Sequence, residues 1–256
     1  MLTFDIRRPL TRWAGRVIIN TRLIHHANMS RRQMTTTVAE LPIVTASGDS
    51  AAAAAYEQLR RMIVTLALPP GSALTEPSLV HRIGIGRTPV REALRRLADE
   101  RLVVIFPRRG MIVAHLGLTE IQQLFEARLL VEGELAKLAA ERATAEEVAR
   151  LNQINDVVHA ARDAASFSAF LMADQQLHRA ISGCGRNVHL ADCAGRLLTL
   201  SDWLWHAQMA RYGIQASDYG SHDPIVAAIT RRDPEGARAA MIAHIVWSRE
   251  LLRVTL

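Results

Sequence analysis

Residues 87–97 have the sequence Arg-Thr-Pro-Val-Arg-Glu-Ala-Leu-Arg-Arg-Leu. This stretch gives the strongest indication of how the first folded part of the chain is built. Pro89 suits the first turn of an α-helix, because the N–H that proline lacks would have no partner there. At helical spacing the apolar side chains fall on one arc that would pack against neighbouring elements: Val90, Ala93, Leu94 and Leu97. A row of arginines, each one helical turn from the next, flanks that arc: Arg87, Arg91 and Arg95. The stretch therefore predicts an amphipathic helix, ending near residue 99, with one strongly basic face.

The elements expected around this helix give the order of a winged helix-turn-helix domain. Two helices should precede it, over residues 51–68 and 76–83. Two short strands should follow it, over residues 103–106 and 111–113, with the turn Pro107-Arg108-Arg109-Gly110 between them. Three helices followed by a two-stranded hairpin indicate a DNA-binding fold over residues 51–116.

The basic helix and the turn carry side chains that suit DNA. An α-helix fits the major groove, where an arginine fork matches the O6 and N7 acceptors of guanine, and other arginines can reach phosphates. In the turn, two arginines stand next to Gly110, whose small size permits close approach to a backbone. A solvated charged face is the alternative for three arginines alone. The order of the helices, the turn and the local charge together favour DNA.

The charge of the chain is divided unevenly along its length. The 256 residues include 31 Lys+Arg and 25 Asp+Glu, a net charge of +6. Residues 1–50 hold seven arginines and three acids (+4), residues 51–116 ten and five (+5), and residues 117–256 fourteen basic residues and seventeen acids (−3). This division is typical of a polyanion-binding module joined to a different module. With two cysteines and no long apolar run, disulfide-rich, secreted and membrane-spanning classes are excluded, and we expect an intracellular protein.

Residues 1–50 are rich in arginine and have no sustained periodicity. We expect them to form a basic, disordered N-terminal extension. A transit-peptide-like segment, or a translation start at Met29 or Met34, are the alternatives.

Residues 117–256 predict a small all-α domain of six helices. Thr119 can cap the first helix, which should run to about residue 142, and Thr144 with Glu147 fits a capping box at the start of the second. The other four are expected at about 167–181, 188–211, 222–231 and 234–253, the last opened by Asp233-Pro234. The chain should therefore be mainly α-helical, a winged helix-turn-helix followed by a helical bundle.

Three of these helices each direct an imidazole towards the apolar interior. Asp174 and His178 are one helical turn apart, and His222 and His244 lie on apolar faces of the last two helices. A buried carboxylate without a partner is strongly unfavourable, so these groups need a cation or hydrogen-bond partners. One divalent metal ion would satisfy all four through three nitrogens and one oxygen, with zinc as the first choice and nickel, manganese or iron as alternatives. The other interpretation is that each histidine is satisfied separately.

The basic helix and its surroundings closely resemble the winged helix of the GntR superfamily of bacterial regulators. The resemblance runs from Leu74-x-Glu76 through residues 87–97 to the turn that ends at Gly110. It implies operator contacts from the recognition helix and the wing tip: Arg87, Thr88, Arg91, Arg109 and Gly110. Two positions depart from the family pattern, because Gly86 replaces a serine often found there and Pro77 stands where some relatives carry a basic residue.

Residues 117–256 resemble the FCD ligand-binding domain of the FadR subfamily, and six helices suggest its shorter, VanR-like group. The resemblance includes Arg128 to Glu132, and a spacing like that of the metal-binding members: Asp174, His178, His222 and His244. It implies a metal with open positions, a small organic-acid effector bound there, and Arg128 as the partner of the effector's carboxylate. An ordinary surface arginine near Glu132 is the alternative for Arg128.

Together these features predict a homodimeric cytoplasmic transcription factor, in this family more often a repressor, and not an enzyme. Two recognition helices related by a two-fold axis would bind a palindromic operator. The effector would shift the dimer between DNA-competent and incompetent arrangements by ~1–3 kcal/mol, acting through the first helix after the wing. The alternatives are a regulator that senses the metal itself and a metal-dependent hydrolase, although no nucleophile elbow, phosphate loop or placed general base supports the hydrolase.

Overall fold

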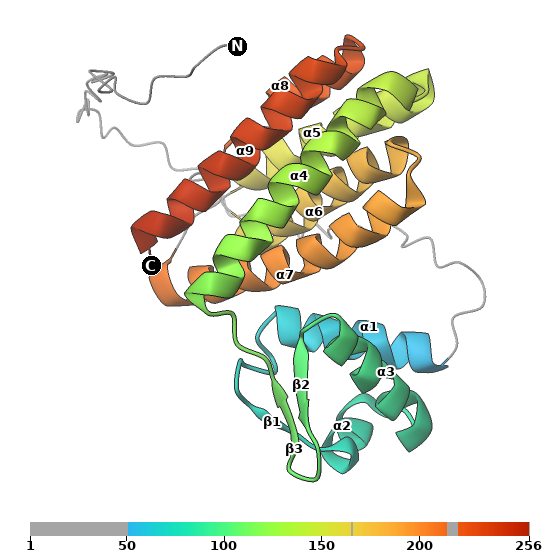
Figure 1. The fold of residues 1–256 in the computed structure, drawn as a ribbon, viewed down its shortest axis with the longest axis vertical. Helices are drawn as coiled ribbons and strands as arrows, with labels where there is room; N and C mark the ends of the chain where they lie inside the picture. The colour runs from blue at the N-terminus through green and yellow to red at the C-terminus, as the bar shows by residue number, and fades with distance from the viewer. Residues whose placement is uncertain (1–50, 165, 214–219, 256) are drawn as a thin grey trace, which may run out of the picture. The chain divides into compact units, whose positions relative to one another are not determined.

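The computed structural model describes residues 51–164, 166–213 and 220–255, so the expected basic extension over residues 1–50 lies outside the described residues. The first three helices are α1 (Ala51–Val64), α2 (Glu76–Ile83) and α3 (Arg87–Asp99), and their order is the predicted one (Figure 1).

Local signals at both ends of α2 explain why it begins and ends where predicted. The Thr75 hydroxyl accepts a hydrogen bond from the Ser78 backbone N–H, which is an N-cap. Gly84 follows the helix with a φ of 69°, and its N–H donates to the Val80 carbonyl. That left-handed conformation favours glycine and closes the helix.

Helix α1 is shorter than predicted, because it ends at Val64 rather than near residue 68. Leu66 adopts a φ of 62°, in the left-handed region. The Leu68 N–H then donates to the Met62 carbonyl at 2.8 Å, which satisfies a group exposed at the helix end. The sequence has no glycine at this turn to indicate the end of the helix. The apolar residues continue at helical spacing beyond Val64, and the predicted helix was therefore too long.

The predicted two-stranded hairpin is part of a three-stranded sheet. Strands β1 (Ala73–Leu74), β2 (Val103–Phe106) and β3 (Gly110–Val113) are antiparallel in the order β1-β3-β2. In the hairpin Phe106 pairs with Gly110, while on the other side of β3 Leu74 pairs with Met111. The prediction missed β1 because two residues are too few to show alternation.

The rest of the described chain forms an all-α bundle of six helices: α4 (Leu118–Arg142), α5 (Ala145–Asp163), α6 (Phe167–Cys184), α7 (Val188–Tyr212), α8 (Asp223–Thr230) and α9 (Pro234–Thr255). The predicted capping box of Thr144 and Glu147 is present. The cap predicted for α4 is wrong: Gly117 is the N-cap, with extended backbone, and Thr119 already lies within the helix.

Helix α4 occupies a central position in the bundle, because it contacts α6, α7, α8 and α9. Figure 1 shows α4 and α9 side by side along much of their length. Gly133 permits this approach, since a Cβ at that position would lie 3.1 Å from Cγ1 of Ile242 on α9. The bundle core includes these fully buried apolar side chains: Phe125, Phe170, Leu177, Ile181, Ile225, Ile229 and Ile245.

One side chain of the bundle belongs to the core of the winged helix. Trp203 of α7 is 1% exposed and packs with a cluster of aliphatic residues from the first three helices and the sheet. That cluster includes Leu59, Ile63, Leu94, Leu97 and Val113. Helix α7 is thus fixed to the winged-helix fold by a large buried aromatic group.

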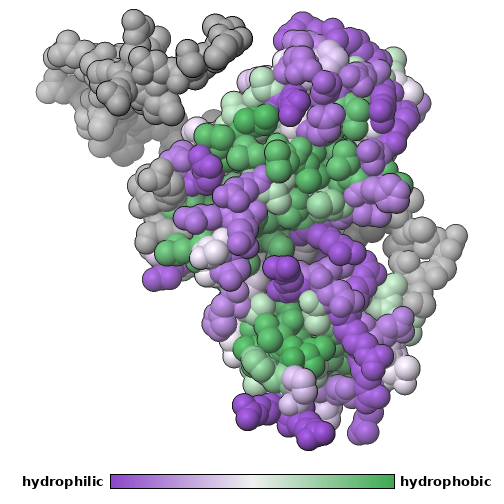
Figure 2. All heavy atoms as spheres, in the orientation of Figure 1, coloured by the Kyte–Doolittle hydropathy of each residue, from purple (hydrophilic) through white to green (hydrophobic). Residues whose placement is uncertain are grey.

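Apolar residues also remain on the surface. On the face drawn in Figure 2, hydrophobic residues gather over α4 and α9 and again over the three-stranded sheet. Leu118 and Leu130 of α4 are 63% and 73% exposed.

Within the part of the chain that the structure describes, no helix combines the length and apolar character needed to span a membrane.

Candidate metal centre and DNA-binding face

Helix α3 separates its apolar and basic residues as its sequence predicts. Its four apolar positions are buried, and its polar face is exposed: Arg87, Thr88, Arg91 and Arg95. The N-cap residue Gly86 makes no side-chain hydrogen bond to the first turn. The first N–H groups of α3 are therefore free of a side-chain cap, and such groups attract anions such as phosphate.

One arginine of the row has an acidic partner on another helix. Arg91 forms a two-pronged ion pair with Glu76 of α2, with Nε–Oε1 and Nη2–Oε2 distances both 2.8 Å. The hydrogen bond from Arg91 lowers the pKa of Glu76. The acid was missed because it is fifteen residues away in sequence and is brought near only when α2 packs on α3.

The wing turn presents its arginines to solvent. Arg108 and Gly110 have φ angles of 64° and 108°, and the Arg109 N–H donates to the Phe106 carbonyl at 3.0 Å. Arg108, Arg109 and Gly110 are all exposed. A Cβ on Gly110 would touch nothing within 4 Å, so backbone conformation, not space within the protein, favours glycine here.

The structure brings the four predicted metal ligands together. Asp174 and His178 come from α6, His222 is the N-cap residue of α8, and His244 comes from α9. All four are buried, between 1% and 7% exposed. Each offers one ligand atom, and these atoms lie within 4.8 Å of one another. His244 thus comes close to Asp174, although the two residues are 70 positions apart in the sequence.

Several nitrogens of this cluster have no hydrogen-bond partner, although they are buried: Nε2 of His178, both ring nitrogens of His222 and Nδ1 of His244. The His222 Nε2 lies 3.0 Å from Oδ1 of Asp174, but not in hydrogen-bond geometry. Buried polar atoms are rarely left without a partner. Three imidazoles and one carboxylate with orphaned donor atoms fit a divalent metal ion in chemistry and in number.

A second layer of buried polar groups supports His178. Its Nδ1 lies 2.6 Å from Oε2 of Glu132, which keeps a proton on Nδ1 and turns Nε2 towards the cluster. The other oxygen of Glu132 accepts from Nε of Arg128 at 2.6 Å. Carboxylates that orient a histidine in this way are common behind metal ligands.

The families that match this chain agree with both halves of its fold. The description "Bacterial regulatory proteins, gntR family" matches residues 51–113, and the FCD domain matches residues 123–246. An uncharacterized HTH-type transcriptional regulator in the TAR-I ttuE-ttuC' intergenic region of Agrobacterium vitis is 31% identical over 151 residues, which are 56% of this chain and 88% of that protein. The chain belongs to the GntR family. It is a DNA-binding transcriptional regulator with an FCD domain, and its relatives are regulators, not enzymes.

Two further comparisons each cover more than three quarters of this GntR-family chain. The HTH-type transcriptional repressor RspR of Escherichia coli (strain K12) is 27% identical over 206 residues, which are 77% of this chain and 87% of the repressor. The solved structure of E. coli McbR/YncC has a TM-score of 0.71 at 20% identity and covers 80% of this chain and 98% of its own. At that identity the likeness shows a shared fold.

In this GntR-family regulator Arg128 is not a surface residue, so the alternative interpretation of it is wrong. It is 3% exposed, and besides Glu132 it donates Nη1 to the Ser201 hydroxyl of α7 at 2.9 Å. Sequence reasoning missed the roles of Glu132 and Ser201. An acid four residues after an arginine on an otherwise apolar helix could have identified Glu132, whereas Ser201 has no local signal.

The charges in the cluster are set by burial and by neighbouring groups. Burial lowers the pKa of His222, and it lowers that of His244 well below the usual value, so both rings favour the neutral form that binds metals. Burial also acts on Glu132, but the charges of Arg128 and His178 outweigh it and hold the pKa at about 2. Burial would raise the pKa of Asp174, yet the fields of His178 and His222 lower it overall.

Proposed function

We propose that this regulator is a homodimeric repressor that binds a palindromic operator and is controlled by a small carboxylate effector at a divalent metal site. Residues 51–116 form its DNA-binding domain, and residues 117–256 form its metal-binding, effector-binding and dimerisation domain. The observation that carries the proposal is a buried cluster of one aspartate and three histidines, in a bundle whose α7 enters the winged-helix core. Such a protein acts in the bacterial cytoplasm, at the nucleoid when bound to its operator.

The proposed operator contacts are five exposed residues of the recognition helix and wing tip: Arg87, Thr88, Arg91, Arg109 and Gly110. The ion pair with Glu76 supports a role for Arg91, because it fixes the direction of the side chain before DNA arrives. Less rotamer freedom then has to be lost on binding. Two copies related by a two-fold axis read two half-sites, hence a palindrome.

The proposed metal ligands are Asp174, His178, His222 and His244, and the orphaned ring nitrogens support this assignment. Three nitrogens and one oxygen suit zinc first, and nickel, manganese or iron next. When bound, a divalent ion supplies a positive centre that attracts a carboxylate effector. Glu132 holds the His178 ring so that Nε2 remains available.

Arg128 is the proposed partner of the effector's carboxylate. Its buried guanidinium already donates to Glu132 and to the Ser201 hydroxyl. A second carboxylate at this guanidinium competes with the neutral hydroxyl, because hydrogen bonds between charged groups are the stronger ones. Effector binding thereby weakens the contact between α4 and α7 at Ser201.

Helix α7 carries that change to the DNA-binding domain. Trp203 lies two residues after Ser201 and is buried in the winged-helix core. A rigid helix that contacts both sites provides a physical route for coupling between them. This route runs through α7, in addition to the expected route through α4, which follows the wing directly.

The proposed dimer interface is the apolar face of α4 with α9 (Figure 2). A groove of about 470 Å³ lies there, lined in part by Leu118, Ile121, Phe125 and Leu252. Leu130→Glu on α4 should give monomers in sedimentation velocity. Met172→Glu on α6 is the control, because Met172 is 70% exposed, much like Leu130 at 73%. A dimeric Leu130→Glu protein would place the interface elsewhere.

A regulator that senses the metal itself is the second candidate. The observation in its favour is the burial of all four ligand residues, which leaves little exposed surface for a separate effector. The two candidates differ in one measurement: a metal sensor releases or binds operator when metal alone is added, whereas the proposed regulator needs the organic acid as well.

A gel-shift assay tests the proposed function. The metal-loaded protein is mixed with DNA from immediately upstream of its own gene, and with a scrambled duplex at near-physiological salt, where phosphate attraction alone gives only weak binding. Preferential binding to the upstream DNA, with release by a small carboxylate, is the expected result. Equal weak binding to both duplexes, with and without metal and candidate acids, would contradict the proposal.

A further inference from the structure

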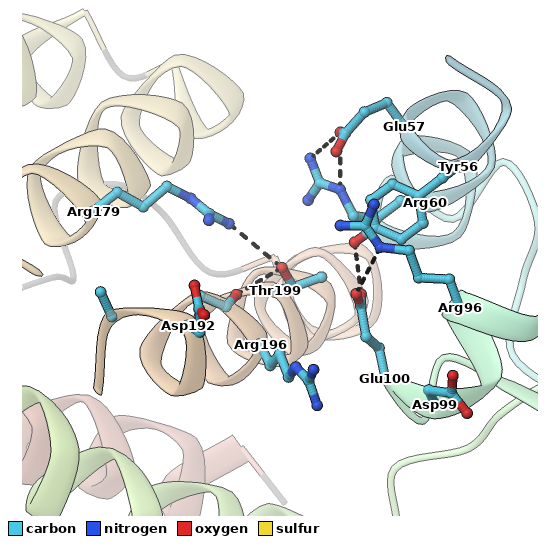
Figure 3. A pocket seen from close by; sticks show the side chains of 12 residues that line it. Tyr56, Glu57, Arg60, Arg96, Asp99, Glu100, Arg179, Asp192, Arg196 and Thr199 are labelled. Carbon is cyan, nitrogen blue, oxygen red and sulfur yellow. Dashed lines mark hydrogen bonds and ion pairs between the residues drawn. The ribbon is translucent and has the colours of Figure 1, made fainter. Parts of the chain in front are cut away.

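A polar cleft lies between the winged helix and the bundle, away from the histidine cluster. It has a volume of about 630 Å³ and is lined by residues of α1, α3, α6 and α7. Four arginines are among them, one from each helix: Arg60, Arg96, Arg179 and Arg196. Figure 3 shows Arg179 reaching in from one side towards Thr199, with Arg60 and Arg96 on the opposite side.

The arginines on the winged-helix side of the cleft already have acidic partners. Arg60 donates Nε and Nη2 to Glu57, at 3.1 and 2.9 Å. Arg96 lies over the ring of Tyr56, 3.6 Å from its centroid, and donates to Glu100 at 3.4 Å. These contacts fix two guanidinium groups along one wall of the cleft.

The arginines on the bundle side do not have such partners among the described residues. Arg179 makes one weak hydrogen bond, at 3.4 Å, to the hydroxyl of Thr199. Neither Arg179 nor Arg196 forms an ion pair with a carboxylate in the part of the chain that the structure describes. A guanidinium has five N–H donors, and because Arg179 is exposed, its other donors are open to water or to a ligand.

Charged groups of both signs act on Arg179. Partial desolvation and the positive charge of Arg60 lower the pKa of Arg179, while the charges of Asp202 and Glu57 raise it. Arg60 shares its charge with Glu57, whereas Arg179 forms no ion pair of its own among the described residues. Four carboxylates line the cleft as well, and none of them forms an ion pair with Arg179: Glu57, Asp99, Glu100 and Asp192.

We propose that this cleft is a binding site for a small phosphate-bearing anion, held between Arg179 and Arg196 of the bundle and Arg60 of the winged helix. Planar guanidinium forks match phosphate oxygens. The volume leaves room for a polar group attached to the phosphate, and the charged lining favours such a group over an apolar one. A ligand that contacts both domains binds only one arrangement of them, so it stabilises that arrangement.

Operator DNA is not the source of this phosphate. On α3 the cleft residue Arg96 and the proposed DNA-contacting Arg87 lie on opposite sides of the buried apolar arc. A nine-residue separation at 100° per residue places them half a turn apart. The ligand is therefore a free small molecule, either inorganic phosphate or a phosphate monoester.

Calorimetric titration of the full-length, metal-loaded protein without DNA tests the site. Inorganic phosphate and glycerol phosphate are the probes, and chloride at equal ionic strength is the blank. We expect one site per chain for at least one probe. Tighter binding of glycerol phosphate indicates a monoester, and equal or tighter binding of inorganic phosphate indicates the free anion. No saturable binding of either probe would overturn the proposal.

Matched variants locate the site. Arg179→Gln should weaken binding by about tenfold or more, because it removes a charge-assisted hydrogen bond. Asp192→Asn should strengthen binding, since it removes a negative charge from the lining. Arg231→Gln is the control, because it loses the same charge at an exposed position at the end of α8. Equal losses in Arg179→Gln and Arg231→Gln would show non-specific attraction and overturn the proposal.

Phosphate binding in the cleft is expected to be independent of operator binding and of the metal site. His222→Ala should lose the response to a carboxylate effector and keep phosphate binding, whereas Arg179→Gln should do the reverse. If both variants lose both responses, the cleft is not a separate site.

Discussion

The recognition face of α3 and the histidine cluster of the bundle are both built from charged or ionisable groups, yet they are held in opposite ways. On α3 the arginines stand in solvent, and Arg91 is restrained by a partly exposed ion pair with Glu76. In the bundle every group is buried, and Glu132 sits between Arg128 and His178 with contacts of 2.6 Å to each.

This difference sets how each region should respond to change. Exposed ion pairs contribute little to stability, because water and salt screen them. A buried charge that loses its partner is strongly unfavourable. Substitutions in the cluster should therefore destabilise the protein, whereas substitutions on α3 should change DNA affinity and leave the fold intact.

The largest expected effect comes from Glu132→Gln. It leaves the buried guanidinium of Arg128 without a compensating charge, which should lower the free energy of unfolding by about 3–5 kcal/mol. Urea denaturation followed by circular dichroism measures the change. Glu134→Gln, two residues further along α4 and far more exposed, is the control. If the two variants are equally stable, the Arg128–Glu132 pair does not hold the cluster together.

Removal of the proposed metal should have an effect of similar size. A ligand present at a thousand times its dissociation constant stabilises the folded state by about 4 kcal/mol. Chelation, or Asp174→Ala with His244→Ala, should therefore lower the melting temperature by roughly 8–16 °C. Elemental analysis of the purified protein measures the metal directly, with His189→Ala as an exposed-histidine control. A double variant with unchanged metal content would rule out the four-ligand site.

The metal-free protein should lose stability as the pH falls below about 6.5. The pKa values of His222 and His244 are lowered in the folded state, so the unfolded chain takes up more protons in that range. Each contributes a loss of about 1.4 kcal/mol per pH unit until its folded pKa is reached. The pKa of His178 is raised instead, so its contribution is complete below about 6.5 and disappears at higher pH. Denaturation at about pH 5, 6.5 and 8 should thus show a maximum near the middle value, and a flat profile would contradict these shifts.

The smallest effect on stability, but a clear one on DNA binding, is expected for Arg87→Ala. Loss of one base-contacting arginine should weaken operator binding by about 5- to 150-fold and leave the melting temperature unchanged. Fluorescence anisotropy with operator and scrambled duplexes measures both the affinity and the specificity ratio. A loss that is equal on both duplexes would assign Arg87 to a phosphate contact instead of a base contact.

Much of the winged helix could be predicted because its signals are local. Pro89, the turn glycines and the spacing of apolar residues act within one or two helical turns, and α2, α3 and β2 begin and end where these patterns place them. The errors fall where local signals are weak. Strand β1 is two residues long, and α1 ends at a left-handed Leu66 instead of a glycine.

The sequence alone predicts which residues form the histidine cluster. It does not predict which neighbouring residues hold them in place. Asp174, His178, His222 and His244 each lie on an apolar face, and an ionisable group in an apolar pattern is visible in the sequence. Ser201 has no such signal, because a serine on a helix is ordinary until the helix packs against Arg128. The same holds for Glu76, whose partner Arg91 lies on a different helix.

Residue type and spacing within a helix were enough to establish the order of the main elements, the basic face of α3 and the residues able to bind a metal. The packing of the helices established which charges are paired, that Trp203 joins α7 to the winged helix, and that four arginines line one cleft. The physical reason is that such contacts join residues far apart in the chain. They arise when apolar faces are buried together, and only then do the polar groups beside those faces meet.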